Sequence, residues 1–68
     1  MSMTASLEKM RELTSDVRDE ALRFQEGNDT AGVRLRNTLL EIQKITRDVR
    51  ASVQDTRKKR EQIKRSMT

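Results

Sequence analysis

The stretch that decides the fold is Gly27-Asn28-Asp29. Apolar residues recur at helical spacing on both sides of it, and both patterns stop here. A glycine just past a helix adopts the left-handed backbone that closes the last turn. Asn28 or Asp29 is a favourable N-cap for a second helix. The three residues therefore predict a tight turn, 27–29, between two antiparallel helices.

Upstream of the turn, residues 6–26 are predicted to form the first helix. Thr4 and Ser6 are both suitable N-caps, so either residue is expected to start it. The apolar residues follow one another at steps of three or four, which places them on one helix face. They are Leu7, Met10, Leu13, Val17, Ala21 and Phe24.

Downstream, residues 29–65 are predicted to form a longer helix with one apolar stripe. The stripe weakens near its end, where Lys59 and Arg60 occupy core-type positions. Val33 and Leu40 point away from it, either as ordinary exposed residues or as a second contact. The stripe comprises Leu35, Leu39, Ile42, Ile45, Val49, Val53, Ile63 and Met67, with Thr38, Thr46 and Thr56 in the gaps.

The two lengths predict an all-α fold, an antiparallel helical hairpin with a long second helix, in a single domain 1–68. At about 1.5 Å per residue the helices span roughly 30 and 55 Å. The first pairs with about 30–50, which leaves 51–67 without a partner in its own chain. We expect a homodimer, as a four-helix bundle or coiled coil, to bury this part. The alternative is that the end of the helix frays in solution.

Composition excludes several classes of protein. The chain has 68 residues and no Cys, His, Pro, Trp or Tyr. The common zinc ligands and nucleophile–base pairs are absent, so we expect no metal, cofactor, small-molecule substrate or enzymatic activity. No apolar run is long enough to span a membrane. The first residues lack the pattern of a signal peptide, which predicts a cytoplasmic protein.

Charge is divided unevenly along the chain. Residues 1–33 carry 4 basic and 7 acidic side chains, a balance of −3. Residues 34–68 carry 11 basic and 4 acidic side chains, a balance of +7. The second helix is therefore the cationic element. Glu41, Asp48 and Asp55 gather to one side of it and do not cancel its charge.

A basic stripe runs opposite the apolar stripe of the second helix, which is typical of a nucleic-acid binder. It consists of Arg36, Arg47, Lys58 and Arg65, flanked by Lys44, Arg50 and Arg57. Phe24 belongs to the apolar face, so no aromatic residue is free to stack on bases. We expect contact with duplex phosphates and weak sequence specificity. A solvated charged face is the plain alternative. The rival function is a coiled-coil adaptor or assembly subunit whose basic C-terminal helix binds an acidic protein partner.

The sequence from Gly27 to Arg36 resembles the bacterial linker-histone-like nucleoid proteins, whose chlamydial members compact the chromosome. The similar features are Gly-Asn, small residues, Gly32 and then Arg34-x-Arg36. The likeness continues through 40–44 to Arg47 and Arg50 and covers about 7–55. The family usually has Lys where this chain has Asp29. The larger members also carry a long Lys/Ala/Pro-rich tail, whose place the run 57–60 takes here.

The resemblance implies a nucleoid protein that condenses or bridges duplex DNA. The residues that match its basic motif are Arg34, Arg36, Lys44, Arg47 and Arg50. With the C-terminal cations, the candidate DNA-binding residues also include Arg57, Lys58, Lys59, Arg60, Lys64 and Arg65. Arg34 is expected at the flank of the basic stripe and Arg36 within it. Gly32 is expected where the end of the first helix passes close to the second.

Overall fold

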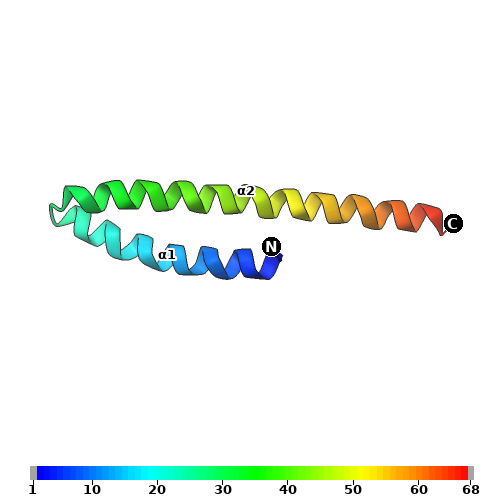
Figure 1. Ribbon diagram of the computed structural model, residues 1–68, viewed down its shortest axis with the longest axis horizontal. Helices are drawn as coiled ribbons and strands as arrows, with labels where there is room; N and C mark the ends of the chain where they lie inside the picture. The colour runs from blue at the N-terminus through cyan, green and yellow to red at the C-terminus, as the bar shows by residue number, and fades with distance from the viewer. Residues whose placement is uncertain (1, 68) are drawn as a thin grey trace.

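The computed structural model describes residues 2–67, which form two helices and no strand. Helix α1 covers Met3–Gln25 and helix α2 covers Asp29–Ser66. They run antiparallel, and α2 continues alone well past the beginning of α1 (Figure 1). The Cα atoms span 62 × 15 × 15 Å. The prediction of an all-α hairpin with a long second helix is confirmed.

The turn between the helices is a Schellman motif centred on Gly27. Its φ of 105° lies in the left-handed region. The Gly27 N–H donates to the carbonyl of Phe24 at 3.0 Å, and the Asn28 N–H donates to that of Arg23 at 3.0 Å. These two bonds satisfy carbonyls that the end of α1 would otherwise leave unpaired. The chain therefore reverses in three residues without losing backbone hydrogen bonds.

The N-caps explain where each helix begins. Asn28 caps α2 as predicted, because its Oδ1 accepts the Ala31 N–H at 3.1 Å. The prediction that Thr4 or Ser6 caps α1 was wrong. Ser2 is the cap, and its Oγ accepts the Ala5 N–H at 3.2 Å. Because this hydrogen bond forms one turn earlier, α1 begins at Met3 rather than near residue 6. At the other ends, α1 stops one residue earlier and α2 one residue later than predicted.

The interface between the helices is thin. Among residues 2–67, two apolar residues are buried, Leu13 at 8% exposure and Ala31 at 0%. Half-buried apolar residues continue it as Met10, Val17 and Ala21 on α1 and Leu35, Ile42, Ile45 and Val49 on α2. Other members of the predicted stripes are exposed, namely Leu7, Phe24, Leu39, Val53, Ile63 and Met67. The hairpin thus buries about half of its apolar pattern and presents the other half to its surroundings.

Threonines fill gaps in the α2 stripe without leaving their hydroxyl groups unpaired. The Thr38 hydroxyl donates to the Arg34 carbonyl at 2.9 Å, and the Thr46 hydroxyl donates to the Ile42 carbonyl at 2.8 Å. Such bonds to the preceding turn satisfy the polar atom locally. The methyl group remains available for the apolar face. A stripe that contains both apolar residues and threonines can therefore still pack against α1.

The free part of α2 starts beside the first residues of α1. A cleft brings Met3 of α1 near Ile45, Val49 and Ser52 of α2. All residues of α2 from Arg50 onward are exposed. We call residues 53–67 the tail; within it Val53, Ile63 and Met67 are 40, 60 and 81% exposed. The expectation that the end of α2 has no partner in its own chain is confirmed.

Candidate functional site

The basic stripe lies on the face of α2 turned away from α1. At about 100° per residue, its members share a sector roughly 40° wide. The sector is roughly opposite Ala31, Leu35 and Val49, which contact α1. Every member is exposed. The four residues are Arg36, Arg47, Lys58 and Arg65.

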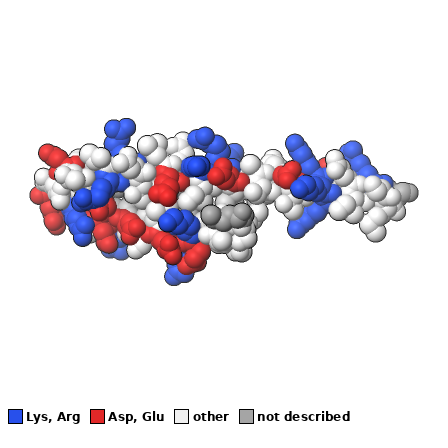
Figure 2. All heavy atoms as spheres, viewed as in Figure 1, with Lys and Arg blue, Asp and Glu red and all other residues white. Residues whose placement is uncertain are grey.

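Most of the candidate DNA-binding cations have no acidic partner within the described residues 2–67. This unpaired group consists of Arg36, Lys44, Arg47, Arg50, Arg57, Lys58, Arg60 and Lys64. In the space-filling view, cations crowd the tail, whereas acids and bases mix over the hairpin (Figure 2). Unpaired cations keep their full charge for a polyanion. The long helix is therefore positively charged along its free side and around its tail.

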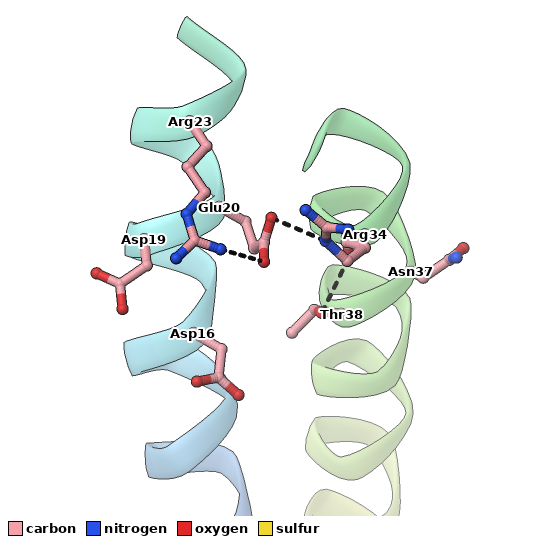
Figure 3. A pocket seen from close by; sticks show the side chains of 7 residues that line it. All are labelled: Asp16, Asp19, Glu20, Arg23, Arg34, Asn37 and Thr38. Carbon is pink, nitrogen blue, oxygen red and sulfur yellow. Dashed lines mark hydrogen bonds and ion pairs between the residues drawn. The ribbon is translucent and has the colours of Figure 1, made fainter. Parts of the chain in front are cut away.

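Arg34 occupies a different place from the one expected beside the basic stripe. Its Nε donates to Oε2 of Glu20 on α1 at 3.1 Å. The same carboxylate binds Arg23 through Oε1 at 3.5 Å, so Glu20 lies between two guanidinium groups (Figure 3). The Glu20 side chain is only 15% exposed. Two residues along a helix are separated by a rotation of about 200°. Arg34 therefore points away from Arg36 and faces α1.

Two further candidates form ion pairs within the tail. Lys59 Nζ lies 3.2 Å from Asp55, and Arg65 Nη2 lies 3.2 Å from Glu61. Both pairs join successive turns of α2, and all four side chains are largely exposed. Exposed pairs of this kind contribute little stability and exchange readily with other ions. Lys59 and Arg65 thus remain accessible to a stronger anion.

The acidic side chains of α1 do not converge into a metal-binding cluster within residues 2–67. Asp16 and Asp19 line a shallow, polar depression beside the Glu20 ion pairs and diverge from one another (Figure 3). No cluster of three or more potential ligands occurs in this part of the chain. The same residues contain no helix with the length and hydropathy of a membrane span.

Two features were missed or left open by the sequence. The Glu20–Arg34 bridge joins positions 14 apart, so no spacing within one helix indicates it. Val33 and Leu40, which point away from the apolar stripe, line a shallow groove of about 580 Å³ at the turn end with Phe24. The second contact face considered for them is therefore open in the monomer.

These features define a small helical hairpin protein whose long helix presents a cationic face. Residues 4–59 match the family model of histone H1-like protein Hc1. The match spans the turn and most of both helices, and the chain belongs to this family of DNA-packaging proteins. The resemblance seen at the turn is thereby confirmed. No curated protein and no solved structure matches the chain.

Proposed function

We propose that this protein is a histone-like nucleoid component that binds duplex DNA through the basic face of α2. Three exposed cations on the side of α2 away from α1, in a chain of the histone H1-like family, support the proposal most directly; they are Arg36, Arg47 and Lys58. The ligand would be the phosphate backbone. Binding would organise or compact DNA in the nucleoid without strong sequence preference.

The dimensions of the basic face suit a duplex. From Arg36 to Arg65 the stripe extends about 43 Å along a straight helix. One turn of duplex DNA is about 34 Å long, so a helix lying along the duplex reaches more than one crossing of the phosphate strands. Each cation that replaces a condensed counterion contributes to affinity and to its salt dependence. Guanidinium groups add paired hydrogen bonds to phosphate oxygens.

We do not expect the basic face to recognise particular bases. The single aromatic residue, Phe24, packs over Gly32 at the turn rather than on the basic face. Phosphate contacts position a protein on DNA but carry no direct sequence information. We therefore expect similar affinities for unrelated duplexes. Binding to single strands should be weaker because stacking platforms are missing.

Compaction also needs a link between DNA-binding faces. We propose that the protein is a homodimer, since Val53, Ile63 and Met67 are exposed on the tail. Two hairpins joined through such residues would carry two basic faces. A dimer of this kind can bridge or coat duplexes, in contrast to charge neutralisation by a long disordered tail.

The test compares two variants that lose the same charges from different faces. Arg36→Gln, Arg47→Gln and Lys58→Gln together remove the centre of the basic stripe. Gel shifts with several duplexes should show a similar loss of affinity for all of them. The slope of log K against log salt should flatten by up to about 0.9 per lost contact.

The matched control replaces Arg11, Arg18 and Lys9 of α1 by Gln, which removes two Arg and one Lys from outside the stripe. It should retain most of the affinity and the salt slope. Equal losses in the two triple variants would show that net charge alone, and not the basic face, governs binding. No shift by the unaltered chain at tens of micromolar protein and about 150 mM salt would favour the adaptor alternative.

A further inference from the structure

The apolar stripe of α2 that packs against α1 continues beyond the first residue of α1. Along α2, one face carries Ile42, Val49, Val53, Ile63 and Met67 in succession. The first two pack against α1, and the last three are exposed on the tail. The tail therefore carries a continuation of an existing interface with nothing on it in the monomer.

We infer that the tail of a second copy covers this face, in an antiparallel two-helix pair. This pairing rests on the homodimer of the proposed function and states which surfaces form it. The pairing itself requires no DNA. The pairing is isologous, because each tail offers the same face to the other, and it closes after two copies. The resulting dimer is a rod with a hairpin at each end and a two-helix segment in the middle.

The position of α1 decides the direction of the pair. In a parallel pair, the contact between the two α2 helices would continue toward their N-termini. From about residue 52 in that direction, the apolar face of each α2 is already covered by its own α1 (Figure 1). The helices would have to bend apart. In an antiparallel pair, the end of one tail reaches the beginning of the partner's α1, and both α2 helices stay straight. The part left uncovered by α1 is then covered completely.

The sequence of the tail fits one antiparallel register. Setting Val53 against Ile63 of the second copy produces the same contact twice, once on each side of the two-fold axis. Thr56 then faces Arg60, whose long stem can cover the threonine methyl while its charge reaches solvent. At the outer ends, Met67 meets Met3, which is 37% exposed where α1 begins.

The charges of the tail oppose this pairing at low salt. Residues 53–67 carry 6 basic and 2 acidic side chains, a balance of +4. The run 57–60 lies next to the two-fold axis, so the cations of both copies come together there. Repulsion between exposed charges is screened when the salt concentration rises. Self-association should therefore strengthen with salt, whereas DNA binding by the same cations weakens with salt.

The first experiment measures the dimer by sedimentation of the full chain without DNA at about 50 and about 500 mM salt. The dissociation constant should fall about tenfold or more at the higher salt. Val53→Asp with Ile63→Asp should make the chain monomeric at both salt concentrations, with its helicity checked by circular dichroism. The matched control, Val33→Asp with Leu40→Asp, changes two exposed apolar residues outside the tail, 62 and 59% exposed, and should dimerise like the parent.

Arg60→Leu removes one cation from the seam and adds an apolar contact. It should tighten the dimer at low salt and reduce the effect of salt. A chain that stays monomeric at about 100 μM and high salt overturns the inference. So does a dimer that salt dissociates, or one that survives the two aspartates in the tail.

The second experiment fixes the geometry, since the chain has no cysteine of its own. Val53→Cys and Ile63→Cys are prepared as separate single variants and oxidised mildly. Each alone should give little disulfide-linked dimer, and their mixture should give the linked heterodimer. Rapid linking of the Val53→Cys variant to itself would indicate a parallel pair and would overturn the antiparallel register. None of these readouts depends on DNA, so failure of the tail pairing and failure of the proposed DNA binding are separate results.

Discussion

The ring of Phe24, at the end of α1, lies directly over Gly32 in the first turns of α2. A β-carbon built on Gly32 would come within 2.6 Å of Phe24 Cδ1 and 2.7 Å of Cε1. Glycine inside a helix costs about 1 kcal/mol relative to alanine. Here that cost is offset by letting an aromatic ring rest against the helix backbone, beside the turn. The close approach of the two helices expected at Gly32 is a contact between the Phe24 side chain and the backbone of α2.

This relationship predicts that Gly32→Ala has opposite consequences in two backgrounds. With Phe24 present, the new methyl group displaces the ring, so the gain in helix propensity is cancelled or reversed. With Phe24→Ala, nothing obstructs the methyl group, and stability should rise by about 1 kcal/mol. Urea unfolding of the four chains of this double-mutant cycle provides the measurement. Equal gains in both backgrounds would mean that the ring does not restrict this site.

Gly27 is predicted to be needed for its backbone alone. An added β-carbon would meet nothing within 4 Å, but φ is 105°. Gly27→Ala should therefore destabilise the hairpin by about 1 kcal/mol through the left-handed backbone. Gly27→Asn should lose less, because asparagine tolerates this region better. Thermal unfolding distinguishes them, and an alanine variant as stable as the parent would contradict the reading of the turn.

The two N-caps are predicted to differ in importance. Asn28 accepts a hydrogen bond from Ala31, whose residue is 0% exposed, so water cannot replace the lost partner. Asn28→Ala should cost about 1–2 kcal/mol of unfolding free energy. Ser2 makes the equivalent bond at an exposed helix end, and Ser2→Ala should cost a few tenths of that. Asn28→Ser should restore most of the loss, whereas a loss as small as that of Ser2→Ala would argue against capping.

Local patterns were sufficient to predict the hairpin. The three- and four-residue spacing defined both helices, and Gly27 with Asn28 defined the turn. The beginning of α1 was mispredicted because Ser2, Thr4 and Ser6 are chemically similar caps, and only three-dimensional contacts choose between them. Helix periodicity also placed the apolar stripe correctly, but it could not show how little of the stripe α1 covers. That depends on the length and depth of the pairing.

The placement of the candidate DNA-binding residues was predictable where it depends on one helix. Arg36, Arg47 and Lys58 share a face because of their spacing, and the structure places that face away from α1. Arg34 was placed wrongly because its position is decided by Glu20, a residue of the other helix. Contacts between helices depend on their rotation and relative height, which neither spacing alone contains. For the same reason, the sequence suggested a dimer but gave no direction for it.

Arg34 and Arg36 belong to the same sequence motif but are predicted to have different roles, because their environments differ. Arg34 is bound to Glu20, and Arg36 has no acidic partner in the described residues. Arg34→Gln should lower hairpin stability by about 0.5–1 kcal/mol and hardly change the salt slope of DNA binding. Arg36→Gln should leave stability nearly unchanged and flatten that slope by about 0.9. A cycle with Glu20→Gln isolates the bridge, because Arg34→Gln should then cost no further stability. If Arg34→Gln reduced the slope as much as Arg36→Gln, then Arg34 would contact DNA and DNA would have to displace Glu20. Glu20 would then compete with DNA for Arg34 instead of stabilising the hairpin through the bridge.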